Sequence, residues 1–296
     1  MYKQKYKIRK EIKWASFILP ALIFYVFIMI LPFIRTIYYS FTDWDGLTSH
    51  FIGLENYKNL IHDTMIKTSF LNTAIYSVSI TIIQNLLGLV LAIFVIKKLF
   101  RVNILRTLFF MPNIFGALLL GFVWGFILEP NVGIVNNVLS ALNLGMLKQD
   151  WLGNPAWGRC MIILLTIWQC VGYSMVIYIA GLQSIPEDLY EAAEIDGAKS
   201  FAQFRYITFP LVAPAFTINI ILSLIGTLKI FDQIYALTNG GPGYSTDSVA
   251  TMIYKLGFGT QSEWGYGTAM SVTLFVFVLV ITCIVVPLLR KREVDM

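Results

Sequence analysis

Residues 184–214 read SIPEDLYEAAEIDGAKSFAQFRYITFPLVAP and form a charged segment between two long apolar stretches. Ser184, followed three residues later by Glu187, matches the pattern of a capping box at the start of a helix. Pro186 would then fall in the first turn, where a missing N–H group is tolerated. Gly197 is suited to end that helix in the left-handed conformation. The segment therefore predicts a short helix that begins near residue 184 and stops at residue 197.

A second short helix is expected after this turn. It would carry Phe201, Phe204 and Ile207 along one side, because residues three or four apart share a helix face. Pro210 would stand at the start of the next apolar stretch. The two helices together predict a small helical knob between the two apolar stretches.

Two interpretations of this knob compete. An amphipathic connector lying on the membrane surface is the ordinary one, but such helices are usually rich in Lys and Arg because inner leaflets are anionic. The first helix here is acidic, with Glu187, Asp188, Glu191, Glu194 and Asp196. Its apolar side consists of Ala192 and Ala193, which bury little area in lipid but let another protein approach closely. These features favour a docking surface for a partner protein.

Most of the remaining chain is apolar. Hydrophobic residues make up 57% of the 296 residues and charged residues 13%, whereas soluble domains carry roughly 25% charged residues. A hydrocarbon core about 30 Å thick requires about 20 apolar residues in a helix. The segments that qualify are 15–38, 71–96, 107–128, 160–182, 208–234 and 267–289. The expected fold class is an all-α integral membrane protein with six transmembrane helices, in one domain over residues 15–289.

The basic residues orient this bundle. Six Lys or Arg residues precede the first apolar segment, four lie between the second and third, two between the fourth and fifth, and three follow the sixth. These regions lie on one side of a six-span chain and hold 15 of its 22 basic residues. The positive-inside rule places them in the cytoplasm, with the tails 1–14 and 290–296. The net charge of +5 is thus read as a topology signal, and no nucleic-acid partner is expected.

Several function classes lack the residues they need. The chain contains no GxxxxGK[ST] loop for nucleotide phosphates and no GxSxG or HExxH motif, so no catalytic residue is expected. Cys160, Cys170 and Cys283 have no CxxC spacing or His cluster beside them, which disfavours a metal site. Ion-coupled secondary transporters usually carry Asp, Glu or His deep in the membrane. Here His50 and His62 lie in a loop and no predicted span has a central carboxylate, which disfavours that alternative.

Polar residues within the spans should face the bundle interior or a cavity, because exposure to lipid is expensive. Asn219, Ser223 and Thr227 recur every four residues and share one helix face. Uncharged hydrogen-bonding groups with nearby aromatic rings suit a neutral ligand rich in hydroxyl groups. The candidate substrate-pathway residues are Asn113, Thr166, Trp168, Gln169, Tyr173, Asn219, Ser223 and Thr227. The same residues could instead serve as hydrogen bonds between helices.

Two charged residues, Lys229 and Asp232, lie three residues apart near the end of the fifth apolar segment. They are expected to form a salt bridge, or the lysine to extend its ammonium group toward the membrane surface. A role in an outer gate is the alternative.

The sequence EAAEIDG at 191–197, followed nine residues later by ITFP at 207–210, resembles the EAA loop of binding-protein-dependent ATP-binding-cassette (ABC) importer permeases. The family pattern is EAA-x3-G-x9-I-x-L-P, and Phe209 here replaces the usual Leu. The matching positions are Glu191, Ala192, Ala193, Gly197, Ile207 and Pro210. YSFTDWDG, FIGLENYKNL and LTNGGP are similar to the carbohydrate-uptake branch of that family, the maltose and glycerol-phosphate type.

This resemblance implies a type I ABC importer permease fold and a subunit that is not itself an enzyme. In that family the loop forms coupling helices that sit in a cleft of the ATPase. The residues expected to couple, within a loop over 184–208, are Glu191, Ala192, Ala193, Asp196, Gly197, Ile207 and Pro210.

The resemblance also implies the assembly around this chain. It predicts a heterodimer with a second homologous permease, two ATPase subunits that use ATP and Mg, an extracellular solute-binding protein, and surrounding membrane lipid. The chain itself would bind no cofactor. Its expected place is the bacterial plasma membrane and its expected substrate a sugar or oligosaccharide, with another polar solute such as glycerol phosphate as the alternative.

Overall fold

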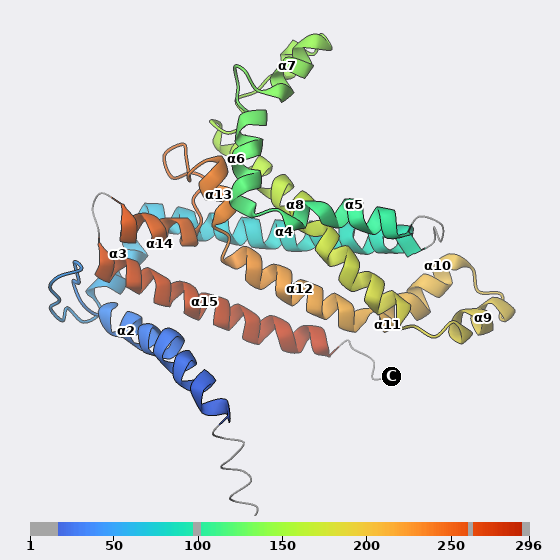
Figure 1. The fold of residues 1–296 in the computed structure, drawn as a ribbon, viewed down its shortest axis with the longest axis horizontal. Helices are drawn as coiled ribbons and strands as arrows, with labels where there is room; N and C mark the ends of the chain where they lie inside the picture. The colour runs from blue at the N-terminus through green and yellow to red at the C-terminus, as the bar shows by residue number, and fades with distance from the viewer. Residues whose placement is uncertain (1–16, 97–101, 260–262, 292–296) are drawn as a thin grey trace, which may run out of the picture. The chain divides into compact units, whose positions relative to one another are not determined.

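The computed structural model describes residues 17–96, 102–259 and 263–291, and the regular structure within these ranges is helical (Figure 1). The chain divides into two compact units. Unit 1 comprises residues 1–62 and 253–274, and unit 2 comprises residues 63–252 and 275–296. The predicted tail 1–14, the basic residues Lys97, Lys98 and Arg101, and most of the tail 290–296 lie outside the described residues.

Four helices are long and apolar enough to cross a membrane: Phe17–Tyr39, Thr64–Ile96 (α4), Pro155–Gln183 (α8) and Trp264–Arg290 (α15). The first of them contains a π-helical turn, Val26–Ile30, and ends in α2, Leu31–Tyr39. Two bent helix pairs can supply further spans. Asn103–Ile114 and Ala117–Ile127 meet at 91°, and Ser200–Leu211 and Ala213–Leu228 meet at 62°. If each pair counts as one span, the described chain has the six predicted from its sequence.

Proline and glycine account for both bends. Pro112 lies inside α5 (Val102–Ile114), and Gly116 begins α6 (Ala117–Ile127) with an extended backbone. Pro210 lies in α11 (Phe209–Leu211), just before the bend. A proline lacks the N–H donor and crowds the preceding helical turn, so a straight helix is interrupted there.

The expectation of one helix over residues 208–234 was wrong. The helix bends at Val212, continues as α12 (Ala213–Leu228), and ends before residue 229. A separate short helix, α13 (Asp232–Leu237), then begins after an irregular step of three residues. The step comprises residues 229–231, KIF, and because two of these three residues are apolar the hydropathy pattern did not reveal that the helix ends there.

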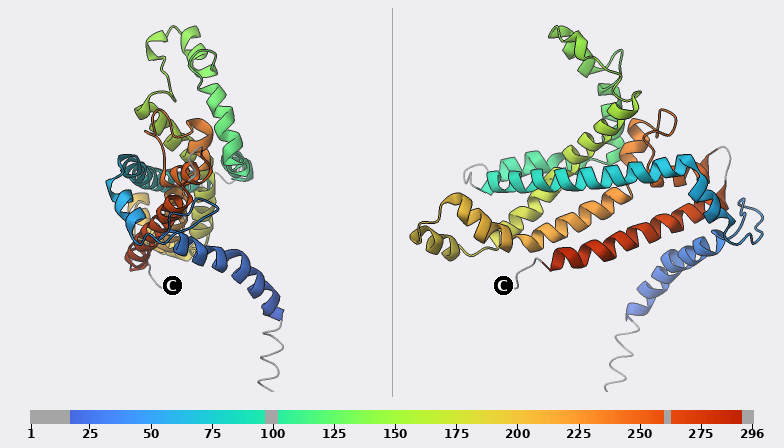
Figure 2. Two further views of the ribbon diagram at one scale, coloured as in Figure 1. Left: turned by 90° about the vertical axis from the view of Figure 1, so that its left-hand side faces the viewer. Right: turned by 180° about the vertical axis from the view of Figure 1, so that it is seen from behind.

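Within unit 2, α4, α8 and α12 pack against one another, and α5 packs against α8 (Figure 2). One apolar cluster includes Tyr76, Ile162 and Ile234, and a second includes Met175 and Val212. The dispersion contacts among these packed side chains stabilise the association of the helices.

A glycine sets the distance between α5 and α8. A Cβ atom added to Gly172 of α8 would overlap the carbonyl oxygen of Phe109 and crowd the backbone of Phe110, both in α5. The two backbones therefore touch directly, as small residues allow in membrane helix pairs.

The charged connector after α8 contains α9 (Asp188–Ile195), α10 (Ser200–Gln203) and a π-helical turn, Phe204–Thr208, that leads into α11. The predicted capping box was wrong, because α8 continues to Gln183 and the Ser184 hydroxyl donates to the Gly181 carbonyl at 2.7 Å. The predicted end at Gly197 was correct. Gly197 has φ +76°, and the Ala198 N–H donates to the Ala193 carbonyl at 2.8 Å.

The other connections also contain short helices: α3 (Glu55–His62), α7 (Ile134–Ala141), the 3-10 turn Gly145–Leu147 and α14 (Val249–Phe258). In unit 1 the loop after α2 is tied down by Asn56, whose amide donates to the carbonyls of Ser40 and Thr42 at 3.1 and 2.8 Å. The backbone N–H of His50 donates to the Asp43 carboxylate at 2.6 Å and lowers the pKa of that carboxyl group.

Candidate functional site

A cavity of about 310 Å³ lies within unit 2. Residues from α4, α5, α8 and α12 line it, together with the irregular step and the first turn of α13. Its polar or charged lining residues are Gln84, Asn113, Thr166, Tyr173, Ser174, Asn219, Ser223, Thr227, Lys229, Asp232 and Gln233. Small-molecule sites in proteins span about 300–1,000 Å³, so this volume lies at the lower end of that range.

The structure brings most of the predicted pathway residues together at this cavity. Those that line it are Asn113, Thr166, Tyr173, Asn219, Ser223 and Thr227. Two predicted residues lie elsewhere. The Trp168 side chain is 43% exposed and meets the Trp124 ring edge-on at 5.6 Å. Gln169 is buried behind the wall, where it donates to the Phe115 carbonyl at 3.1 Å.

Gln169 nevertheless positions a residue of the wall. Its side-chain oxygen accepts a hydrogen bond of 3.1 Å from the amide of Gln233, which does line the cavity. Gln169 of α8 therefore links the break between α5 and α6 to α13 and holds one amide of the cavity in place.

The hydrogen bonds within the wall decide what it offers to a ligand. The hydroxyls of Thr166, Ser223 and Thr227 each donate to a carbonyl four residues earlier in their own helix, at 2.7 Å. Their protons are thus engaged, and their remaining lone pairs can accept. The Asn219 amide donates to the Ser174 carbonyl at 3.1 Å, which leaves the Asn219 oxygen as an acceptor. The wall is consequently suited to a ligand that donates hydrogen bonds.

A buried network of hydrogen bonds joins residues of the wall to one another and to residues behind it, across three helices. The Asn85 amide of α4 donates to the Ser223 hydroxyl of α12 at 2.9 Å, and the Tyr178 hydroxyl of α8 donates to the Asn85 oxygen at 2.8 Å. The Gln84 amide donates to the Ser174 hydroxyl at 2.8 Å. Polar residues of these spans therefore serve in both ways considered from the sequence: some line the cavity and some bridge helices.

Lys229 and Asp232 differ from the sequence expectation. Both are exposed and both line the cavity. No ion pair within 4 Å joins Lys229 to Asp232 in the described part of the chain, so the expected salt bridge is wrong, whereas the alternative of a lysine that extends toward the membrane surface stays a prediction. The cavity thus holds one ammonium donor and one carboxylate acceptor among otherwise uncharged groups.

Sequence reasoning also missed Gln84 and Ser174. Gln84 lies in α4 among other buried polar residues, including Thr81 and Asn85. The cost of a polar group in lipid applies to α4 as it does to α8 and α12. A search for polar residues in every span would have found this helix.

The turn between α13 and α14 is fastened to α4. The Asn72 amide donates to the carbonyls of Ser245 and Asp247 at 2.8 and 3.0 Å, and the Tyr76 hydroxyl donates to the Thr246 carbonyl at 2.9 Å. The Ser248 hydroxyl donates to the Ile230 carbonyl at 2.6 Å and so fixes the irregular step beside the cavity.

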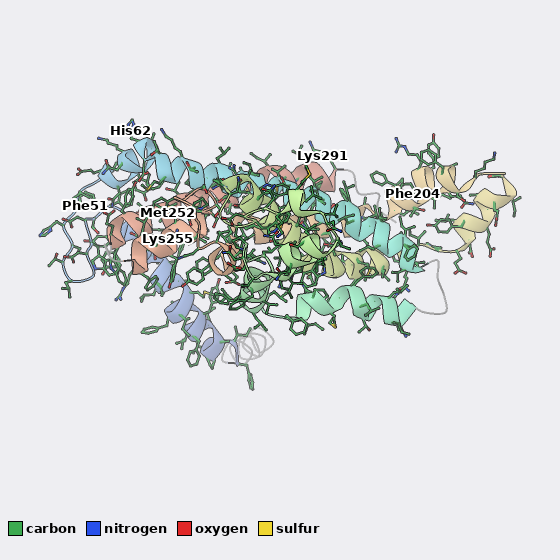
Figure 3. The ribbon with its side chains drawn as sticks, turned by 90° about the horizontal axis from the view of Figure 1, so that it is seen from above. Phe51, His62, Phe204, Met252, Lys255 and Lys291 are labelled. Atoms are coloured by element: carbon green, nitrogen blue, oxygen red, sulfur yellow. The ribbon has the colours of Figure 1, made fainter. Side chains whose placement is uncertain are left out.

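The connector with α9 and α10 lies at one end of unit 2, away from α7 (Figures 1 and 2). Figure 3 marks this end with Phe204, where side chains project outward. Glu191, Ala192, Asp196 and Gly197 are exposed, whereas Ala193, Ile207 and Pro210 are half-buried.

Large apolar side chains are exposed on the same connector. Ile195 is 87% exposed, and Phe201 and Tyr206 are each 78% exposed. The Tyr190 and Thr208 hydroxyls, 3.0 Å apart, hold α9 against the π-helical turn. Apolar residues on a charged projection that is tied internally are typical of a protein contact surface.

Comparisons with known proteins add relatives over nearly the whole chain. A family model described as "Binding-protein-dependent transport system inner membrane component" matches residues 84–293. A probable starch degradation products transport system permease protein, AmyD of Thermoanaerobacterium thermosulfurigenes, is 43% identical over 281 residues, covering 95% of this chain and 94% of that protein. The trehalose/maltose transport system permease protein MalF of Thermococcus litoralis is 32% identical, covering 98% and 97%.

A solved structure shares the fold. It belongs to a bacterial ABC transporter involved in the import of the acidic polysaccharide alginate, and one of its chains superimposes with a TM-score of 0.86. The sequence identity is 24%, and the match covers 98% of this chain and 99% of that chain.

Proposed function

The chain belongs to the family of binding-protein-dependent transport system inner membrane components, and on that basis we propose that its cavity is part of the route by which a sugar or oligosaccharide crosses the membrane. The chain is a non-catalytic permease subunit of an ABC importer. The observation that carries the proposal is the polar cavity among apolar helices. A solute that donates several hydrogen bonds matches its acceptor-rich wall, and sugars are rich in hydroxyl donors.

The charges on the wall extend this match. A carboxylate such as Asp232 can accept from hydroxyl groups, and the Lys229 ammonium can donate to ring or hydroxyl oxygens. Hydrogen bonds with one ionised partner are stronger than neutral ones. The relatives named for starch products, trehalose and maltose support a sugar. Glycerol phosphate or another polar solute is the second candidate, favoured only by the ammonium group.

The connector 184–208 is proposed to couple this route to an ATPase. Its projection from the helices and its exposed Ile195 and Phe201 support a docking role. The residues proposed for coupling are Glu191, Ala192, Ala193, Asp196, Gly197, Ile207 and Pro210. In this proposal the ATPase subunits use ATP and Mg, and their closure moves α9 to α11 as one lever that reorients the spans.

The remaining partners follow from the same proposal. A second permease would complete the route as a heterodimer, because an oligosaccharide of several hexose units is larger than one cavity of about 310 Å³. An extracellular solute-binding protein would deliver the sugar. The excess of basic residues on one side of the six-span arrangement supports a bacterial plasma membrane location with both termini in the cytoplasm.

Reconstitution with co-expressed partners tests the proposal. The complete transporter in liposomes, with binding protein outside and ATP inside, should take up a labelled maltooligosaccharide, and that solute should stimulate ATP hydrolysis. Glycerol phosphate is the comparison solute. Equal stimulation by both solutes, or uptake that continues without the ATPase, would contradict the proposed function.

A further inference from the structure

A second cavity of about 210 Å³ lies in unit 2 and shares no lining residue with the first. It lies at the bend between α11 and α12. Phe209, Ala213 and Phe216 line it from these helices, Leu289 lines it from the end of α15, and Arg205 lines it from the π-helical turn.

The local sequence explains why a hollow forms there. The 62° bend at Val212 separates α11 from α12. Pro210 cannot donate a backbone hydrogen bond within that turn. The Phe209 and Phe216 rings lie on the two sides of the bend, with centroids 6.4 Å apart. The bend therefore leaves a groove with aromatic walls that helix packing does not fill.

The groove combines one cation, Arg205, with a lining that is apolar apart from Thr217. Arg205 is exposed, and in the described part of the chain no carboxylate lies within 4 Å of its guanidinium group. A guanidinium group binds phosphate in a bidentate manner, while its methylene stem packs along apolar surface. The matching ligand must present an anionic oxygen group next to hydrocarbon.

A phospholipid has that chemistry, and the groove lies next to the ends of two apolar helices, α12 and α15. Arg205 precedes the apolar helix α12, and Leu289 is followed directly by Arg290 and Lys291 at the end of α15. Basic residues at the ends of spans attract anionic headgroups. We propose that this groove binds one anionic phospholipid, with its phosphate on Arg205 and the first part of an acyl chain between Phe209, Phe216 and Leu289.

Two other occupants fit the groove less well. Inorganic phosphate would satisfy Arg205 but would leave the apolar walls open to water. A purely apolar helix of a neighbouring subunit would fill the walls but would leave the guanidinium group without an anion. The assignment of the groove to the cytoplasmic leaflet rests on the orientation given in the proposed function, but binding of the lipid does not require transport.

Native mass spectrometry of the assembled transporter, stripped of lipid in detergent, tests the proposal. Phosphatidylglycerol, phosphatidylcholine with the same acyl chains, and inorganic phosphate are titrated separately. Wild type should retain one phosphatidylglycerol in preference to phosphatidylcholine, and inorganic phosphate should not compete. Arg205→Gln should weaken phosphatidylglycerol binding roughly tenfold, since it removes a charge-assisted hydrogen bond, and should leave phosphatidylcholine binding nearly unchanged. Arg205→Lys should restore part of the difference.

Lys199→Gln is the matched control, because Lys199 is an exposed basic residue of the same connector that does not line the groove. An equal loss in Lys199→Gln and Arg205→Gln, or equal retention of the two lipids by wild type, would overturn the proposal. Ala213→Trp fills the groove and should lower binding of both lipids in a transporter that still assembles. Unchanged lipid binding in Ala213→Trp would also overturn the proposal. If Arg205→Gln does not assemble, the result for Ala213→Trp is the test of the proposal.

If the transporter binds the lipid as described but transports no sugar, the proposed function is wrong. The proposed lipid site is not contradicted by that result. The side of the membrane is checked separately by labelling Ser200→Cys, in a chain whose three native cysteines are replaced by serine, with a thiol reagent that cannot cross the bilayer. Labelling from outside would contradict the orientation, without changing the lipid measurements.

Discussion

The contact between α5 and α8 makes Gly172 the most informative single position in the structure. In Gly172→Ala the new methyl group would overlap the Phe109 carbonyl and crowd the backbone of Phe110. Backbone atoms of a packed helix cannot rotate aside as a flexible side chain can, so α5 must move away from α8. Asn113, one turn further along α5, lines the cavity and would move with it.

The expected magnitude follows from two opposing effects. Overfilling a packed core costs about 1–3 kcal/mol, and a clash with backbone places this variant near about 3 kcal/mol. Alanine is favoured over glycine inside a helix by about 1 kcal/mol. The net destabilisation is therefore about 2 kcal/mol. At about 2–4 °C for each kcal/mol in a large domain, the midpoint of thermal unfolding should fall by about 4–8 °C.

Gly125→Ala in α6 is the matched control, because no atom lies within 4 Å of the added Cβ there. That variant should be as stable as wild type or slightly more stable. Thermal unfolding of the detergent-solubilised transporter, followed by size-exclusion chromatography, compares the two variants directly. If Gly172→Ala matches Gly125→Ala in thermal stability, the inferred backbone contact is wrong. Sugar uptake by Gly172→Ala should fall as well, because Asn113 is displaced from the wall.

Three other predictions concern the proposed route and its coupling. Gly197→Asp should insert normally but lose most sugar-stimulated ATP hydrolysis. A residue with a side chain is strained at φ +76°, and the aspartate adds a further negative charge to the connector. Full stimulation in this variant would show that the connector does not couple the ATPase to transport. Thr227→Trp should abolish uptake while ATPase binding in a pull-down persists, whereas Ile218→Trp, at a position of α12 that is 51% exposed and away from the cavity, should transport normally. Lys229→Gln and Asp232→Asn should each raise the KM for sugar about tenfold, the effect of one lost charge-assisted hydrogen bond; an unchanged KM in both would show that neither charge contacts the solute.

The number of spans could be predicted because an apolar segment of about 20 residues is rarely anything other than a membrane-spanning helix. The first and last residues of the helices were harder to predict. α4 begins at Thr64, seven residues before the predicted start at residue 71, because TMIKTSF is polar enough to end an apolar window and still continues the helix. Ser184 was misassigned for a related reason: the turn before it remains helical, so its hydroxyl bonds backward to Gly181.

The site could be predicted where polar residues repeat along one helix, as Asn219, Ser223 and Thr227 do. Cavity residues that come from other helices could not be predicted from a repeat along one helix. Gln84 reaches the cavity through the pairing of α4 with α8, which no local pattern encodes. Lys229 and Asp232 reach it because α12 stops at Leu228 and the chain turns, a backbone break in a segment that still reads as apolar.

The bonds from Asn72 and Tyr76 to residues 245–247 limit how the transporter can open. A loop anchored at several carbonyls to a long helix cannot swing like a hinged flap, since each bond would have to break first. Any widening of the passage at that end must carry the turn and α4 together as one rigid piece. A spin label on the exposed Tyr244 of the turn should therefore keep a constant separation from one on the exposed Leu71 of α4 throughout the transport cycle.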